Sequence, residues 1–356
     1  MPDAGVMYRI ARPLLLSLDA ERAHQLTLAA LRVGARIGLL TPVRPQAEDA
    51  AVHLAGLRFP NRVGLAAGFD KNGTCVDALG ALGFGFIEVG TVTPRPQPGN
   101  PPPRVWRSVK ARAVINRMGF PNDGAQRVVE RLAQRSYRGI CGINIGKNAG
   151  TPLSHAVDDY VNGFRTVYSQ ADYVAINVSS PNTTDLRKLQ ESARLRPIME
   201  AVLHERVRLE RQSGRRVPVF VKLSPDLTDS EVADTARVLR ALKVDGVIAT
   251  NTSSRRPAGL ESEFAAREGG LSGEPLHPMS VAVIARLRSV LGEGFPIIGV
   301  GGIVSVQAAA STFAAGADLI QNYTGLIYEG PALIAKLLAL RPPDSERVAH
   351  HHARDA

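Results

Sequence analysis

The sequence has only two cysteines, Cys75 and Cys141, among 356 residues. Two thiols are too few for a disulfide framework and are typical of a reducing compartment. No apolar run approaches the roughly 20 residues that a membrane-spanning helix needs. The segment "PLLLSL" at residues 13–18 is too short for a signal peptide and runs directly into charged residues. We therefore expect an intracellular protein with at most peripheral membrane contact.

Aromatic residues and clustered metal ligands are also scarce. Aromatic side chains make up 5% of the chain, so the core of this 44% hydrophobic sequence must be mainly aliphatic. No set of His, Asp or Glu has the spacing of a metal site, and we expect no metal. The triplet His350–His352 lies in a polar tail and is expected to be solvated. Neither cysteine has a neighbour that would create a thiolate, so both are expected to be buried.

The net charge is strongly positive, with a formal value of +10 and a pI near 10.0. Such a charge favours anionic partners, namely phosphates, anionic lipid or nucleic acid. Nucleic-acid binding would require a basic stripe with aromatic platforms, or a known module, and the sequence has neither. We therefore expect no nucleic-acid partner.

Short apolar runs alternate with helical segments along most of the chain. Continuous apolar strands between helices predict a parallel sheet covered on both faces. Eight runs are the number that closes a (β/α)8 TIM barrel. The alternative is an open doubly wound sheet, but the dinucleotide-binding glycine fingerprint is missing and polar residues end nearly every run. The runs are "VGLAAG" from Val63, "FIEVGT" from Phe86, "CGINIG" from Cys141, "YVAINV" from Tyr173, "VPVFVKL" from Val217, "GVIATN" from Gly246, "PIIGVGG" from Pro296 and "DLIQNYT" from Asp318.

Two long polar segments interrupt this alternation. The first, "TPRPQPGNPPPR" at residues 93–104, is too rich in proline for a helix or a central strand. The second spans residues 252–273, between the sixth run and the next helix. Loops of this length in a compact domain are usually functional or disordered.

Residues 1–45 form a different unit, an N-terminal helical extension. We place Pro13 at the first position of a helix and Asp19 at the cap of a second one. Apolar residues of the second helix form one stripe, which belongs either to a hairpin packed on the barrel or to a basic module on a membrane surface. The pattern alone favours packing. The barrel is expected over residues 46–340 and a disordered polar tail over 341–356; the stripe comprises Leu26, Ala30, Val33 and Ile37.

The chemistry of a (β/α)8 barrel lies where its strands end. The last two strand ends carry "GVGGI" and "YTG", where such barrels commonly bind phosphate through backbone N–H groups. Asparagines are abundant at the other strand ends, beside Lys71 and Lys222. Carboxamides donate and accept, so they suit a planar heterocycle, although single asparagines also cap helices. The set predicts flavin mononucleotide (FMN) and a small anionic heterocycle; the asparagines are Asn116, Asn144, Asn177, Asn182 and Asn251.

The motifs as a set resemble the dihydroorotate dehydrogenases, from the first N-terminal helix to about Leu340. The resemblance is to the class 2, quinone-dependent branch, because Ser180 stands at the catalytic-base position where class 1 enzymes have cysteine. The helical extension points the same way. The matching motifs, in chain order, are "AAGFDKNG", "EVGTVTPRPQPGNPPPR", "INRMGF", "GINIGKN", "NVSSPNT", "VKLSPD", "ATNTS", "GGLSG", "IIGVGGI" and "YTGLIYEGP".

The resemblance implies roles for individual residues. It implies that dihydroorotate is held by Lys71, Asn116, Arg117, Met118, Gly119, Phe120, Asn177, Asn182, Asn251 and Thr252. It implies that FMN is held by Ala66, Ala67, Gly68, Phe69, Asp70, Lys71, Thr91, Asn144, Asn177, Lys222 and Thr250, with its phosphate at Gly273, Gly302, Tyr323 and Thr324.

The resemblance also implies a reaction. Ser180 takes the proton from C5 of dihydroorotate while hydride passes from C6 to the flavin, giving orotate in pyrimidine biosynthesis. Lys222 stabilises charge near flavin N1. A serine is a poor base, so the proton is expected to pass on through a water or a neighbouring hydroxyl. The loop at Pro181 is expected to act as a lid.

The final electron acceptor implied is a membrane quinone. The N-terminal helices would then rest on anionic lipid at the cytoplasmic face of the membrane and admit the quinone to a monomeric enzyme. Two alternatives stay open: a class 1-like enzyme that uses fumarate or nicotinamide, and a flavin barrel that acts on another pyrimidine or an enone.

Overall fold

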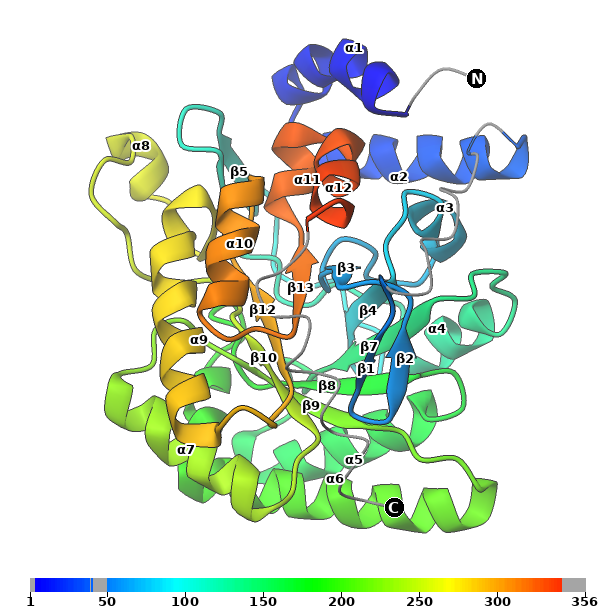
Figure 1. Ribbon diagram of the computed structural model, residues 1–356, viewed down its shortest axis with the longest axis vertical. Coiled ribbons are helices and arrows are strands. Elements are labelled where there is room, and N and C mark those ends of the chain that lie inside the picture. The colour runs from blue at the N-terminus through cyan, green and yellow to red at the C-terminus, as the bar shows by residue number, and fades with distance from the viewer. Residues whose placement is uncertain (1–3, 39, 41–49, 341–356) are drawn as a thin grey trace.

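A closed barrel of eight parallel strands forms the body of the protein (Figure 1). The computed structural model describes residues 4–38, 40 and 50–340. Each strand overlaps one of the eight predicted runs, which confirms the (β/α)8 barrel and shows that the open-sheet alternative is wrong. In barrel order the strands are β10 (Gly246–Ala249), β12 (Ile297–Val300), β13 (Leu319–Asn322), β3 (Val63–Leu65), β4 (Phe86–Val92), β7 (Ile140–Ile145), β8 (Tyr173–Asn177) and β9 (Val219–Leu223).

Helices surround the barrel and bury its outer face in an aliphatic layer. Cys75 and Cys141 are buried there, as predicted, and burial raises the pKa of their thiols to about 11 and about 12. The helices are α3 (Val76–Gly80), α4 (Ala125–Leu132), α5 (Ala156–Val167), α6 (Ser192–Ser213), α7 (Asp229–Ala241), α8 (Ser262–Ala265), α9 (His277–Leu291), α10 (Val306–Ala314), α11 (Thr324–Glu329) and α12 (Pro331–Leu338).

One end of the barrel is closed by aromatic packing and a hairpin. Tyr173 and Phe220 meet edge to face inside it, with ring centroids 5.2 Å apart. Glycine at 142 makes room, since a Cβ there would lie 2.1 Å from the Tyr173 ring. The hairpin of β1 (Val52–Leu54) and β2 (Leu57–Phe59) packs on this layer through buried Val52 and Phe59. The interior of the barrel is therefore left accessible at the carboxyl ends of the strands.

A small antiparallel sheet stands beside that open end. Its order is β11 (Gly270–Gly273), β6 (Ala113–Asn116) and β5 (Val105–Ser108). The sequence indicated only long polar segments in this region. The sheet was not predictable because its four-residue strands lie next to proline- or arginine-rich stretches, and β11 pairs with a strand more than 150 residues earlier in the chain.

The N-terminal extension forms two helices, α1 (Ala4–Ser17) and α2 (Ala20–Arg36). Asp19 caps α2 as predicted, because its carboxylate accepts hydrogen bonds from the Glu21 and Arg22 amides at 3.1 and 3.0 Å. The prediction for Pro13 is wrong: α1 begins at Ala4 and Pro13 lies inside it. The residues before Pro13 are held in the helix by packing, since Tyr8 contacts Gly330 and donates to the Ile327 carbonyl.

The apolar stripe of α2 faces away from the barrel. Leu26, Val33 and Ile37 are 54%, 55% and 64% exposed, and Ala30 is exposed too. The helix packs through a different face, which includes Ala23 and Leu28. The interpretation of this stripe as a packing surface is therefore wrong. The three large side chains of the stripe, together with exposed large side chains of α1, form what we term the outer apolar residues: Val6, Met7, Ile10, Leu14, Leu26, Val33 and Ile37.

Within the described residues, no helix has both the length and the hydropathy to cross a membrane. The predicted linker at 41–49, the tail at 341–356 and the His350–His352 triplet lie outside the described residues.

Candidate active site

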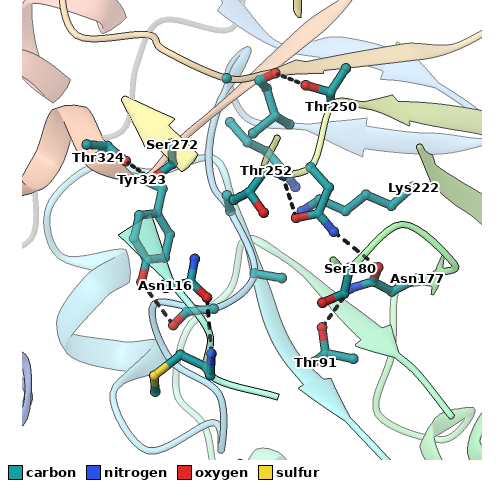
Figure 2. A pocket seen from close by; sticks show the side chains of 18 of the residues that line it. Thr91, Asn116, Asn177, Ser180, Lys222, Thr250, Thr252, Ser272, Tyr323 and Thr324 are labelled. Carbon is teal, nitrogen blue, oxygen red and sulfur yellow. Dashed lines mark hydrogen bonds between the residues drawn. The ribbon is translucent and has the colours of Figure 1, made fainter. Parts of the chain in front are cut away.

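A cavity occupies the carboxyl ends of the barrel strands and is lined on one side by residues of β6 and β11, including Asn116 and Ser272 (Figure 2). It brings together most of the residues predicted from the sequence. These are Ala66, Ala67, Gly68, Lys71, Thr91, Asn116, Met118, Gly119, Phe120, Asn177, Ser180, Asn182, Lys222, Thr250, Asn251, Thr252, Gly273, Gly302, Tyr323 and Thr324.

Four predicted residues do not line this cavity. The Arg117 guanidinium turns outward over the Trp106 ring, 5.7 Å from its centroid. Asp70 binds the Thr74 and Cys75 amides and so shapes the turn that carries Lys71. Phe69 lines a neighbouring cavity, and Asn144 lies behind the wall. These residues support the site instead of forming its surface.

A hydrogen-bonded group of amides and hydroxyls forms one wall. Thr91 Oγ1 donates to Asn144 Oδ1 at 2.6 Å and accepts from Asn177 Nδ2 at 2.9 Å. Asn251 Nδ2 in turn donates to Asn177 Oδ1 at 3.2 Å. These bonds fix the orientation of each carboxamide, and therefore which donors and acceptors it presents to a ligand.

Glu88 lies beneath this wall and was not among the predicted site residues. It is fully buried and accepts hydrogen bonds from Asn144 (2.8 Å), Tyr173 (2.8 Å) and Gln321 (2.7 Å). Lys222 Nζ lies 3.4 Å away and forms its ion pair. Burial and the Glu88 charge raise the pKa of Tyr173 well above its ordinary value. The available signal was a single acid within the apolar run "FIEVGT".

The loop after β8, residues 178–190, carries Ser180. We call it the serine loop. The Ser180 side chain is buried, and its Oγ accepts a hydrogen bond from the Asn182 amide at 3.2 Å. Among the described residues, no carboxylate or imidazole forms a hydrogen bond with Ser180. Asn182 Oδ1 and Thr183 Oγ1 are buried without hydrogen-bond partners. The serine is thus placed by backbone contacts, with a free hydroxyl three residues away.

Arg187 ties the serine loop to the neighbouring strand ends. Its guanidinium donates to Asp226 Oδ2 at 2.7 Å and to the Thr252 carbonyl at 2.9 Å. Asp226 also accepts from the Ser254 amide at 2.7 Å, so the loops after β8, β9 and β10 are linked. Neither residue was predicted to belong to the site, although Asp226 ends the motif "VKLSPD".

The opposite corner of the cavity combines glycines with hydroxyls. Thr324 Oγ1 donates to Ser272 Oγ at 3.0 Å, and both line the cavity beside Tyr323 (Figure 2). Gly302 has φ +68°, and a Cβ there would lie 2.5 Å from His277 Cβ, so only glycine fits. Asn322, a buried polar residue at the end of β13, donates to the Ile303 carbonyl and accepts from the Leu326 amide.

A second cavity lies between the N-terminal helices and the barrel. It is mainly apolar and shares Lys71, Met118 and Tyr323 with the first. His24 lines it against the Phe69 ring; burial and the Lys71 charge lower the pKa of its imidazole to about 3, so the ring is neutral. Arg107 fixes the end of α1 through the Leu15 carbonyl at 3.0 Å. This enclosed space was not itself predicted, although the resemblance implied that the N-terminal helices admit a quinone.

Lys71 stands at the boundary between the two cavities. Its Nζ donates to the Gly68 carbonyl at 2.7 Å. Burial lowers its pKa to about 8, although the Glu21 carboxylate opposes this effect. The group is therefore largely protonated at neutral pH and suited to an anionic ligand.

The first cavity fits a planar heterocycle that carries N–H groups. Two buried carboxamide oxygens, Asn182 Oδ1 and Gln321 Oε1, have no partner, and both residues line the cavity. An unpaired buried acceptor is costly, so a bound donor would be favoured at each. Lys222 adds a cation with spare N–H donors, and the Ser272–Thr324 corner adds hydroxyls for an anionic group.

Comparison with known proteins gives consistent results. A family model described as dihydroorotate dehydrogenase matches residues 49–339. The chain is 52% identical, over 92% of its length and 93% of the relative, to "Dihydroorotate dehydrogenase (quinone)" of Verminephrobacter eiseniae. It is 50% identical to the protein of that name in Methylococcus capsulatus, over 92% and 96%. A solved DHODH of Eimeria tenella in complex with ferulenol superposes with a TM-score of 0.84 at 39% identity, covering 90% and 89% of the two chains.

Proposed function

The chain belongs to the dihydroorotate dehydrogenase family, and on this premise we propose that it oxidises dihydroorotate to orotate with a quinone as electron acceptor, in pyrimidine biosynthesis. The observation that carries the proposal is the pair of adjoining cavities. One is polar and contains Ser180, and the other is apolar and lies under the N-terminal helices. The similar relatives are named for this reaction and this acceptor.

We propose FMN as the cofactor of the first cavity. It would contact Lys222, Thr91 and Gln321, with its phosphate at the Ser272–Thr324 corner beside Gly273 and Gly302. Bound there, FMN would supply the acceptor for the hydride that leaves C6 of dihydroorotate. The Lys222 cation supports negative charge beside it, and Glu88 keeps this lysine in place.

The chain's own residues would orient the substrate and move one proton. Asn116, Asn177 and Asn251 present fixed amides to the pyrimidine edge, and Lys71 pairs with its carboxylate. Ser180 takes the proton from C5. The proton would then pass to the Thr183 hydroxyl, which lies three residues further along the chain and is buried without a hydrogen-bond partner. Orientation and electrostatics thus replace a group that titrates near pH 7.

We propose that the second cavity receives the quinone. Its mainly apolar lining suits a quinone ring and tail, and the neutral His24 adds a hydrogen-bonding group without a charge. The outer apolar residues lie on the same two helices, beside exposed Arg9, Arg22, Arg32 and Arg36. We propose that these residues rest on anionic lipid at the cytoplasmic face of the membrane, and that the protein is a peripheral monomer.

The membrane proposal predicts an effect of charge on α1. Ile10→Glu together with Leu14→Glu is expected to weaken binding to anionic vesicles about tenfold or more, because two side chains that would enter the lipid become charged. Co-sedimentation with phosphatidylglycerol vesicles measures the effect. The matched control is Val207→Glu, since Val207 is 40% exposed but lies on the barrel helix α6. Equal loss in both proteins would contradict the assignment of this face.

The pKa of Lys71 predicts a pH dependence of orotate binding. Below about pH 8 the free site carries the lysine charge that an anionic ligand needs. Above this pH the lysine must take up a proton when orotate binds. The affinity for orotate therefore falls by up to about tenfold per pH unit, until the pH reaches the pKa of Lys71 in the complex, which the bound anion raises. Titrations of the flavin spectrum with orotate from pH 6 to 9.5 measure this slope. The Lys71→Met variant should bind orotate weakly at every pH. A wild-type affinity for orotate that stays constant from pH 6 to 9.5 would refute the role of Lys71 in binding the anion.

The proposed function itself is tested anaerobically. Dihydroorotate should bleach the flavin absorbance of the purified protein, and a short-chain quinone, but neither fumarate nor NAD, should restore it. Recovery with fumarate or NAD would overturn the acceptor. An absence of bleaching in flavin-loaded protein would overturn the substrate.

A further inference from the structure

The proline-rich segment, residues 93–104, connects the two cavities without lining either of them. It contains six prolines, each of which restricts φ and removes a backbone donor. Such a segment is stiff, so a displacement at one end is passed to the other. The role of this segment is not explained by the reaction described above.

One end of the segment is bound to α2. Arg104 Nε lies 3.1 and 3.0 Å from the two carboxylate oxygens of Glu21, and Arg104 Nη2 lies 2.6 Å from Oε1. The two side chains are only 13% and 18% exposed. The same guanidinium donates to the Pro98 and Asn100 carbonyls, each at 2.8 Å. Arg104 therefore fixes the fold of the segment and its position on α2 with one planar group.

The same segment is bound to the serine loop through Asn100, four residues before Arg104. Asn100 Nδ2 donates to the Arg117 carbonyl at 2.8 Å and to the Asn182 carbonyl at 3.1 Å. The Asn182 amide contacts Ser180 Oγ, and its side chain donates to Asn116 Oδ1 at 3.0 Å. The fit is close, because a Cβ on Gly119 would lie 2.7 Å from the Asn100 side chain.

We propose that Arg104 and Asn100 are positioning residues, which make the placement of the serine loop depend on the seating of α2. The chain of contacts runs from Glu21 through Arg104 and Asn100 to Asn182. This inference rests on the proposed function, since it takes the serine loop as the substrate side and α2 as a wall of the quinone cavity. Occupation of the quinone cavity and binding of orotate then favour each other, and linkage makes the effect reciprocal.

A purely structural role predicts something different. If these contacts only stabilise the fold, their loss lowers the melting temperature and leaves orotate affinity unchanged. Leu239→Ala supplies that comparison, because Leu239 packs α7 in the core, away from α2, and lines neither of the two cavities. It should lower the melting temperature and change orotate affinity less than twofold.

The experiment measures the dissociation constant of orotate on the flavin-loaded protein, with and without a short-chain quinone. Arg104→Gln and Asn100→Ala are each expected to weaken orotate about fivefold, and to abolish the tightening that quinone produces in the wild type. Glu21→Gln should have no further effect in the Arg104→Gln background, since both changes break one connection. Arg104→Lys keeps the ion pair and should recover part of the affinity.

Each result decides the matter. Unchanged orotate affinity in both Arg104→Gln and Asn100→Ala overturns the inference, and so does an equal loss in Leu239→Ala. The inference is also overturned if the orotate affinity of the wild-type protein is the same with and without quinone. Wild-type protein that binds no orotate refutes the proposed function instead. If Arg104→Gln fails to fold, Asn100→Ala and Arg104→Lys carry the test.

Discussion

Ser180→Ala is expected to slow the bleaching of the flavin by dihydroorotate about 10²- to 10⁴-fold, the usual contribution of a positioned base. No other proton acceptor takes its place, because among the described residues no imidazole or carboxylate bonds to this serine, and its Oγ contacts only the Asn182 amide. Anaerobic stopped-flow absorbance at saturating dihydroorotate measures the rate directly.

Two controls separate chemistry from binding in this experiment. Orotate affinity of Ser180→Ala should stay within about twofold of wild type, since the side chain is small and the loop is fixed by other contacts. Ser179→Ala, which removes the neighbouring hydroxyl, should slow bleaching far less. Wild-type bleaching in Ser180→Ala would show that the proton leaves by another route.

Lys222→Met is expected to destabilise the fold by about 3–5 kcal/mol, because it leaves the Glu88 carboxylate buried without its cation. Glu88 is fully buried and Lys222 is 4% exposed, so water cannot replace the lost charge. Urea unfolding of the flavin-free protein measures the loss. The variant should also retain little flavin after purification.

The double variant Lys222→Met/Glu88→Gln tests the cause of that loss. A neutral amide at position 88 needs no cation and can still accept from Tyr173, which lies 2.8 Å from Glu88 Oε2. Most of the stability should therefore return, although the flavin would still lack its cation. If the single and double variants unfold at the same urea concentration, the unpaired charge of Glu88 is not the cause of the lost stability.

The barrel was predictable because each buried parallel strand is a continuous apolar run that ends in polar residues. The β5–β6–β11 sheet was not, since β11 is four residues within a polar segment and its partner is distant in sequence. Pro13 shows a related limit. Local preference places proline at the start of a helix, whereas the contact of Tyr8 with Gly330 extends α1 beyond it.

The site was predictable to the extent that barrel geometry brings strand ends together. Side-chain direction was not: Arg117 lies beside Asn116 in sequence, yet its guanidinium stacks on Trp106. Glu88 was not predictable from barrel geometry, because it lies in the interior of β4 and not at its carboxyl end. The second cavity depends on how α1, α2 and the barrel meet, which no single stretch of sequence specifies.

The closed end of the barrel offers a place to attach probes. The tip of the β1–β2 hairpin, Ala55 and Gly56, lies across the barrel from both cavities, while Val52 and Phe59 anchor its base in the core. A fluorophore, or a tether to an electrode or bead, introduced at this tip would leave the N-terminal helices, the proposed membrane face, pointing outward. Immobilised in this orientation, every molecule would present the same face to an arriving vesicle.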